Sequence, residues 1–202
     1  MTKIKLCGLS RGCDIEAANA LRPDYVGFVF AAKSRRCVSP ERAAELKGML
    51  RPEIRAVGVF VDEAPERVAQ LLNDGVIDLA QLHGNEDEEY LRRLRALTDR
   101  PLLQAFRIRT EEDLRRAEMS TADEILLDAG AGTGTVFDWT LLRGAERRYF
   151  LAGGLNPENV RDAIRNVRPY GVDVSSGIET DSRKDQKKMA AFVAAVREEN
   201  RQ

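Results

Sequence analysis

Short apolar segments alternate with longer amphipathic, charged segments along the chain, and this alternation limits the fold more than any other feature. The apolar segments are rich in β-branched residues and are too short for typical helices, so they predict strands. Eight of them are found, at residues 4–8, 25–30, 56–61, 79–84, 102–108, 124–129, 149–154 and 171–177. Strands that alternate with helices pair in parallel through right-handed crossovers, which allows either an open doubly wound sheet or a closed barrel.

The segments between the predicted strands carry helix signals. Ser39 stands at a predicted N-cap with Pro40 at the first helical position, and Asn156 with Pro157 repeats the arrangement. Further helices are predicted to begin near residues 14, 64, 87, 110, 140 and 184. Eight units in 202 residues leave about 25 residues each, which fits a (β/α)8 barrel near its lower size limit. No linker or shift in composition marks a second domain, so we expect a single-domain α/β TIM barrel over residues 1–202.

The charge balance and the cysteine content exclude several classes of function. The 32 Lys and Arg residues nearly equal the 33 Asp and Glu residues, which argues against a nucleic-acid or membrane partner. Cys7, Cys13 and Cys37 are odd in number and lack zinc spacing, and His83 is the single histidine, so we expect neither a metal site nor a disulfide framework. The first ten residues lack the apolar run of a signal peptide, which predicts a cytoplasmic protein. The sequence carries no signal of oligomeric state.

Three residues stand where a barrel places its catalytic groups, at the carboxyl ends of strands. Cys7 ends the first predicted strand, and its thiolate could act as a base or nucleophile, or the residue could be a small buried hydrophobe. Asp128 ends the sixth strand, where a partly dry site could keep it protonated as an acid, although a capping or ion-paired aspartate is the alternative. His83 ends the fourth strand and could bind substrate or be a hydrogen-bonded residue of the rim.

Two predicted loops carry small residues where barrels commonly bind phosphate. Gly153 and Gly154 follow the seventh strand, and Ser176 and Gly177 follow the eighth, so backbone N–H groups can face an anion there. The glycines in residues 130–134 do not have the spacing of a nucleotide-binding loop. They predict a mobile loop that folds over a ligand, or a flexible turn.

The basic segment 33–36, which follows the second strand, could hold an anion through Arg36 or could be a solvated loop. Lys5 shares a strand face with Cys7, because side chains alternate with period two, and in a closed barrel that face points inward. A buried ammonium needs a counter-ion, and Asp173 on the eighth strand is the candidate once the barrel closes. We therefore predict a Lys5–Asp173 ion pair that either favours the Cys7 thiolate or merely closes the barrel.

Several segments resemble one enzyme family in order and spacing over nearly the full length of the chain. These segments are KLCGLS, DYVGFVF, GVFV, QLHG, LLDA followed by the glycine-rich loop and FDW, FLAGGLNPENV and GVDVSSGIE. The family is phosphoribosylanthranilate isomerase of tryptophan biosynthesis. The resemblance implies a single (β/α)8 barrel that catalyses an Amadori rearrangement without a cofactor. The substrate would be N-(5-phosphoribosyl)anthranilate and the product 1-(2-carboxyphenylamino)-1-deoxyribulose 5-phosphate.

The resemblance also implies roles for individual residues. The general base falls on Cys7, the general acid on Asp128, the arginine at the anthranilate end on Arg36, a substrate contact on His83, and the phosphate loops on Gly153, Gly154, Ser176 and Gly177. The chain departs from the family pattern at Ser10, where threonine is usual, at Arg35, where proline is common, and before Lys184, where a glycine is often found. The second departure leaves the conformation of the Arg36 loop open.

Two other functions remain as alternatives. The analogous isomerase of histidine biosynthesis is also a phosphosugar barrel, but it uses aspartates for both roles, and position 7 is a cysteine here. A phosphosugar-binding barrel without activity is the second alternative. The presence of a base, an acid and a glycine-rich loop in one chain argues against it.

Overall fold

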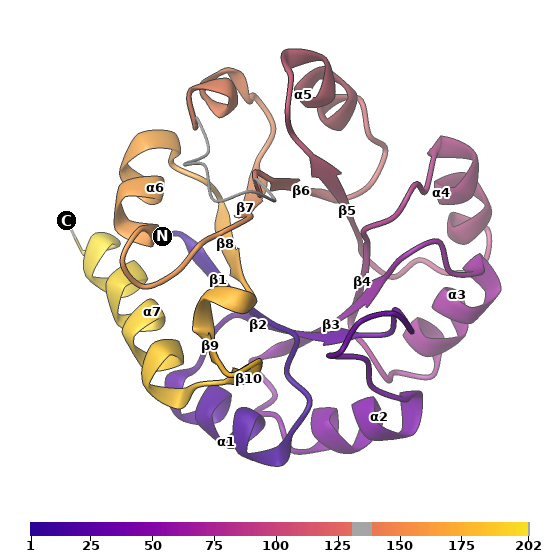
Figure 1. The fold of residues 1–202 in the computed structure, drawn as a ribbon. Coiled ribbons are helices and arrows are strands. Elements are labelled where there is room, and N and C mark those ends of the chain that lie inside the picture. Colours follow the sequence, from indigo (N-terminus) through magenta and orange to yellow (C-terminus); the bar gives the residue numbers. More distant parts are fainter. Residues whose placement is uncertain (131–138, 202) are drawn as a thin grey trace.

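Eight parallel strands close into a barrel in the computed structural model, which describes residues 1–130 and 139–201 (Figure 1). The strands are β1 Lys3–Cys7, β2 Tyr25–Val29, β3 Arg55–Phe60, β4 Leu79–Leu82, β5 Leu102–Arg107, β6 Glu124–Asp128, β7 Tyr149–Ala152 and β8 Gly171–Val174. Each strand pairs with the next along the chain, and β8 pairs with β1, with Asp173 in register with Lys5. The structure thus confirms the predicted (β/α)8 barrel and all eight strands.

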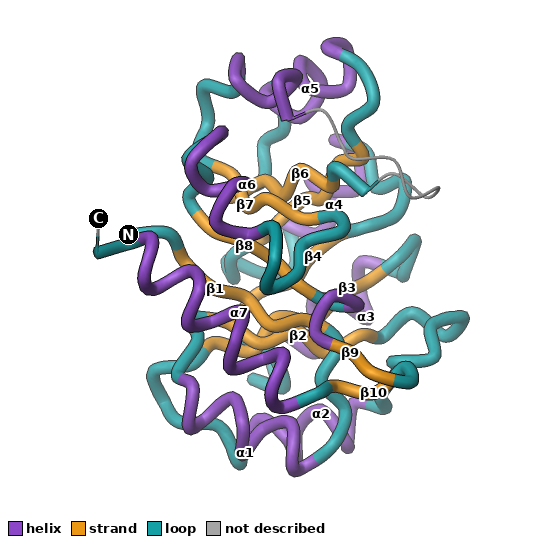
Figure 2. The backbone as a smooth tube through the Cα atoms, turned by 60° about the vertical axis from the view of Figure 1, so that its left-hand side comes forward, coloured by secondary structure: helices purple, strands orange, loops and turns teal. Residues whose placement is uncertain are grey.

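Two layers of apolar side chains hold the barrel together, because strand residues alternate between its inside and its outside. Inside, the cluster includes Tyr25, Val57 and Phe150, and the Tyr25 and Phe150 rings meet edge to face at 5.4 Å. Outside, fully buried residues such as Leu6 and Val26 pack under the helices. Figure 2 shows the helices surrounding the strands. The interior is therefore a packed core, which leaves the ends of the strands for chemistry.

Most helices begin at the predicted caps. They are α1 Gly12–Leu21, α2 Pro40–Gly48, α3 Pro65–Asn73, α4 Glu88–Arg95, α5 Glu111–Glu118, α6 Val160–Val167 and α7 Gln186–Glu199. The Ser39 side chain accepts a hydrogen bond from the Arg42 amide, and Asp87 caps α4 in the same way. Within the described part of the chain, no helix is both long and apolar enough to cross a membrane.

Two helix predictions were wrong in detail. The side-chain oxygen of Asn156 does accept from the amides of Glu158 and Asn159, as an N-cap does, but residues 157–159 form a turn and α6 starts only after Asn159. The helix expected near residue 140 is a short 3-10 helix, η1 Trp139–Gly144. The helix predicted to begin near Lys184 is α7, which starts after Asp185, and it is preceded by a small hairpin of β9 Glu179–Thr180 and β10 Arg183–Lys184 that the sequence pattern did not indicate.

Candidate active site

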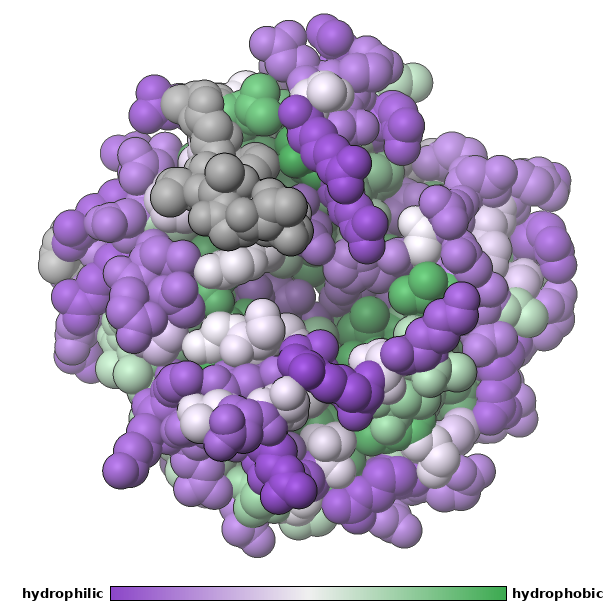
Figure 3. Space-filling model, viewed as in Figure 1, coloured by the Kyte–Doolittle hydropathy of each residue, from purple (hydrophilic) through white to green (hydrophobic). Residues whose placement is uncertain are grey.

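The end of the barrel that carries the β9–β10 hairpin is hollowed at its centre (Figure 3). Cys7 and Asp128 are the last residues of β1 and β6, so parallel pairing brings them to this same end. His83 follows β4 directly and lies at this end as well. The structure therefore brings the three predicted chemical groups to one rim of the barrel.

Cys7 is buried at the mouth of the barrel, and two glycines lie beside it. Gly27 is its partner on β2, and a Cβ at that position would lie 2.7 Å from Cys7 Sγ. Gly8 turns the chain at φ +79, and a side chain there would collide with Arg36. Two glycines thus give the thiol its space and let Arg36 pass beside it.

The predicted ion pair beneath Cys7 is confirmed. Lys5 Nζ lies 2.9 Å from Asp173 Oδ1, and the Lys5 side chain is fully buried. Burial raises the pKa of the Cys7 thiol, the positive charges of Lys5 and Lys184 oppose that effect, and Asp173 adds to it. The net pKa stays above the ordinary value of 9.0, so the free protein holds Cys7 as a thiol at neutral pH.

Removing the buried pair as a unit should raise the pKa of Cys7 further. The variant Lys5→Met/Asp173→Leu deletes both charges, and the loss of the nearer, favourable charge of Lys5 should outweigh the loss of Asp173. Ultraviolet titration of the thiolate reads Cys7 alone if Cys13 and Cys37 are replaced by alanine. An unchanged titration in the folded variant would leave the pair with a structural role only.

A matched control is the pair of Lys3, on the same strand as Lys5, with Asp24, just before β2; this pair is partly exposed, with Nζ 2.7 Å from Oδ1. The variant Lys3→Met/Asp24→Leu removes the same two kinds of charge two residues further from Cys7. We expect it to leave the Cys7 titration where it is in the parent protein.

Asp128 is ionised in the free site, which agrees with the paired aspartate among the two alternatives for this residue and not with the protonated one. Its Oδ1 accepts a hydrogen bond from the Gly130 amide at 2.8 Å, and its Oδ2 lies 3.3 Å from His83 Nε2. Burial raises the pKa of this carboxyl, but these two donors and the nearby Arg107 charge lower it by more, so the net pKa lies below 3.8. The sequence placed Asp128 at the carboxyl end of β6, but it did not indicate the donors that hold its charge.

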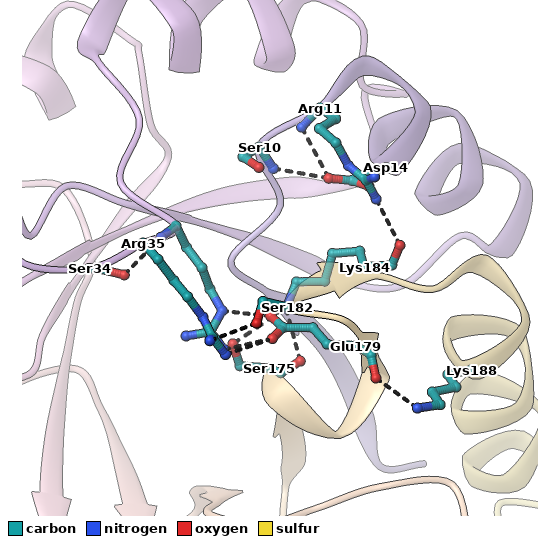
Figure 4. Close-up of polar contacts among 11 residues, drawn as sticks. Ser10, Arg11, Asp14, Ser34, Arg35, Ser175, Glu179, Ser182, Lys184 and Lys188 are labelled. Carbon is teal, nitrogen blue, oxygen red and sulfur yellow. Dashed lines mark hydrogen bonds and ion pairs between the residues drawn. The ribbon is translucent and has the colours of Figure 1, made fainter.

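Arg36 is held by a carboxylate that the sequence analysis missed. Its Nε and Nη2 donate to Glu179 Oε1 and Oε2 at 2.6 and 2.9 Å, in a bidentate pair. Lys184 Nζ, almost fully buried, donates to the same carboxylate at 2.7 Å, and Figure 4 shows Lys184 beside Glu179. Burial raises the pKa of Glu179, but the Arg36 and Lys184 bonds and charges bring it down to about 2. Glu179 ends the GVDVSSGIE segment, and the need to balance the basic segment 33–36 was the available signal for it.

Arg35 replaces a proline of the family pattern and makes contacts that proline cannot make. Its Nη1 donates to Ser182 Oγ at 2.7 Å, and its Nη2 lies 3.3 Å from Glu179 Oε2 (Figure 4). Ser182 has φ +64 and Asp181 φ +48 in the turn of the β9–β10 hairpin, a left-handed conformation that glycine adopts with less strain. The two departures thus meet in one contact, which joins the Arg36 loop to the hairpin. A cavity of about 480 Å³ lies beside this contact and is lined by Gly8, Ser10, Arg36 and Lys184 among others.

The two predicted phosphate loops are packed against each other. Gly153 and Gly154 have φ +94 and +66, in the left-handed region that favours glycine. A side chain at Gly177 would collide with the Leu155 carbonyl, so the loop after β8 lies directly on the loop after β7. Residues 131–134 of the predicted glycine-rich loop lie outside the described residues.

Comparisons with known proteins agree over nearly the whole chain. Residues 4–195 match the family model of N-(5′-phosphoribosyl)anthranilate (PRA) isomerase. An N-(5′-phosphoribosyl)anthranilate isomerase from Acetivibrio thermocellus is 44% identical over 98% of this chain and 97% of its own length. Another from Thermoanaerobacter sp. is 45% identical over 98% of both chains.

Solved structures give the same picture. The crystal structure of phosphoribosyl anthranilate isomerase from Thermotoga maritima superposes with a TM-score of 0.90 at 37% identity, over 98% of this chain and 100% of that one. A structure of such an isomerase in complex with reduced 1-(o-carboxyphenylamino)-1-deoxyribulose 5-phosphate superposes with a TM-score of 0.88. A 3-hexulose-6-phosphate synthase from Salmonella typhimurium, 15% identical with a TM-score of 0.73, shares the fold.

Proposed function

The chain belongs to the N-(5′-phosphoribosyl)anthranilate isomerase family, and on this premise we propose that Cys7 and Asp128 catalyse its reaction as base and acid. The protein is an isomerase of tryptophan biosynthesis, which converts N-(5′-phosphoribosyl)anthranilate to 1-(2-carboxyphenylamino)-1-deoxyribulose 5-phosphate. The observation that carries the assignment is the thiol and the carboxyl at one barrel end, with cations beside the thiol and donors on the carboxyl.

The rearrangement needs one proton given and one proton taken. Asp128 protonates the furanose ring oxygen, the C1′–O bond breaks, and the nitrogen lone pair forms an iminium ion. Cys7 then takes the proton from C2′, and the C–H electron pair forms the C1′=C2′ bond as the iminium electrons return to nitrogen. The resulting enolamine becomes the ketone by tautomerisation. At about 10² to 10⁴ for each group, the acid and the base each stabilise the transition state by roughly 3 to 5 kcal/mol.

In the free site the proton lies on Cys7 and not on Asp128, whereas the reaction needs the opposite arrangement. Burial keeps Cys7 protonated, and the donors around Asp128 keep that carboxyl ionised. The working form has the proton on Asp128 and the charge on Cys7, where Lys5 and Lys184 stabilise it. One turnover leaves Asp128 ionised and Cys7 protonated, so the resting distribution returns without any net exchange of protons.

We assign the phosphate of the substrate to Gly153, Gly154, Ser176 and Gly177, and its anthranilate carboxylate to Arg36. The support for the phosphate end is the pair of glycine-bearing loops that touch each other at the carboxyl ends of β7 and β8. The support for the other end is the guanidinium of Arg36, which spends two of its five N–H donors on Glu179 and has three left for a carboxylate. His83 lies between the two ends and is assigned a substrate contact.

The two ends of the substrate can be separated by kinetics. Arg36→Ala should raise KM by about tenfold or more, because charge-assisted hydrogen bonds to the substrate carboxylate are lost, and should change kcat less. Inorganic phosphate should compete with substrate, and its inhibition constant should be the same in Arg36→Ala and the parent protein. Lys33→Ala, an exposed change in the same loop, is the control and should alter neither constant. A weaker inhibition by phosphate in Arg36→Ala would reverse the assignment of the two ends.

One assay distinguishes this function from its alternatives. The purified protein is incubated with freshly made phosphoribosylanthranilate, and the loss of the substrate fluorescence is followed. Turnover of this substrate supports the proposal, whereas turnover of the histidine-pathway aminoaldose alone or mere binding of phosphosugars would support the alternatives. We also propose that residues 1–202 act as one domain and that the protein works in the cytoplasm.

A further inference from the structure

The ring of His83 is held between two side chains, one on each nitrogen. Its Nε2 lies 3.3 Å from Asp128 Oδ2, and its Nδ1 lies 3.1 Å from Gln81 Nε2. Gln81 belongs to β4 and stands two residues before His83, so both side chains point into the barrel. Gln81 is only 1% exposed, whereas His83 reaches the mouth.

The position of the ring proton follows from the chemistry of these partners. The Asp128 carboxylate can only accept hydrogen bonds, so its contact at 3.3 Å favours a neutral ring that carries its proton on Nε2. The lone pair is then on Nδ1, which needs a donor, and the amide N–H of Gln81 is that donor. With the amide reversed, its oxygen would face the Nδ1 lone pair, and the two acceptors would repel each other.

Gln81 supplies this donor, but the other end of its amide is left without a hydrogen-bond partner. Its Oε1 is buried and has no hydrogen-bond partner among the described residues. An apolar side chain of similar length would fill the same space between Val59 and Leu103 without an unsatisfied oxygen. Buried polar groups without partners are rare and call for an explanation, and here the other end of the amide supplies it.

We propose that Gln81 is a positioning residue of the isomerase, which fixes His83 in the tautomer whose Nε2–H donates to Asp128. The proposal rests on the assignment of Asp128 as general acid. When Asp128 gives its proton to the ring oxygen, it becomes a carboxylate, and a donor already aimed at it stabilises the transition state. The opposite tautomer would turn a lone pair toward that growing charge and would slow the step.

The single histidine of the chain makes the tautomer directly measurable. Nitrogen NMR of protein labelled at histidine reports which ring nitrogen carries the proton, with no overlap from other rings. We expect the neutral ring of the wild-type protein to be almost wholly in the Nε2–H form. A neutral ring protonated on Nδ1 would overturn the proposal, and this result does not depend on any variant folding.

Two variants test the role of Gln81. Gln81→Met removes the donor and should leave a mixture of tautomers, with kcat lowered by about tenfold to a hundredfold and KM little changed. Gln81→Glu places an acceptor beside Nδ1, so nitrogen NMR should find a proton on that nitrogen. A folded Gln81→Met protein with the wild-type tautomer or with wild-type kcat would overturn the proposal.

A matched control exists on the next strand. Gln104 is also a buried glutamine, but it bonds the Glu86 carbonyl and the Ser120 hydroxyl and does not touch His83. Gln104→Met should therefore leave the His83 tautomer unchanged. Failure of the proposed function can be recognised separately. A fully active Asp128→Asn protein would show that Asp128 is not the acid, whereas the NMR result on the His83 tautomer would be unaffected.

Discussion

Replacing Cys7 by alanine is expected to lower kcat by about a hundredfold or more, with little change in KM. In the proposed mechanism the sulfur takes the C2′ proton only in the transition state, so its loss should remove little of the binding energy of the substrate in the ground state. Lys5 and Lys184 remain in the variant with their partners Asp173 and Glu179, but the thiolate that their charges favour is gone. Initial rates measured over a range of substrate concentrations separate kcat from KM.

The other two cysteines are the controls for this change. Cys13 and Cys37 are exposed, and neither lies at the carboxyl end of a barrel strand. Cys13→Ala and Cys37→Ala should be nearly silent in both constants. A Cys7→Ala protein that keeps more than about a tenth of the wild-type kcat would contradict the assignment of the base.

Asp128→Asn is expected to reduce kcat by a similar factor of about a hundred or more. The amide has nearly the shape of the carboxyl, and its oxygen can still accept from the Gly130 amide, so the loop after β6 should keep its place. It has no acidic proton for the ring oxygen, and its N–H₂ group cannot accept from His83. Competition by inorganic phosphate should be unchanged, which would show that the substrate site is intact.

Asp123→Asn offers a matched control at the opposite end of the same strand. Asp123 precedes β6, pairs with Arg95 and accepts from the Leu102 amide, far from the mouth of the barrel. The same carboxyl-to-amide change there should leave kcat at the wild-type value and cost a small amount of stability, about 1 kcal/mol or less. Equal losses of kcat in the two variants would point to a general loss of structure and not to an acid at Asp128.

The buried lysine shows how far a sequence argument can reach into the site. Period two placed Lys5 on the face of Cys7, closure of the barrel placed β8 next to β1, and the cost of a lone buried ammonium demanded Asp173. Each step uses a rule that holds for any closed parallel barrel. The Lys5–Asp173 contact could therefore be predicted from the sequence alone.

The Arg36 network shows where such reasoning stops. Arg36 and Glu179 are far apart in the chain, and neither belongs to a pair of adjacent barrel strands. The contact between them depends on the path of two loops and on a short hairpin that no hydrophobic periodicity predicts. Arg35 and the segment before Lys184, which both depart from the family pattern, meet there for the same reason, through Ser182.

The sequence itself determined the order of the strands and their closure into a barrel, because periodicity and closure act through near neighbours. It also determined that Lys5 and Cys7 face inward, and that Cys7, His83 and Asp128 share one rim. The state of those groups was decided only by the tertiary structure. An apolar strand end alone would keep the Asp128 carboxyl protonated, but hydrogen bonds from the Gly130 amide and the His83 ring hold it as a carboxylate. Charge depends on donors that arrive from other loops and strands within hydrogen-bond distance, and those distances exist only once the chain has folded.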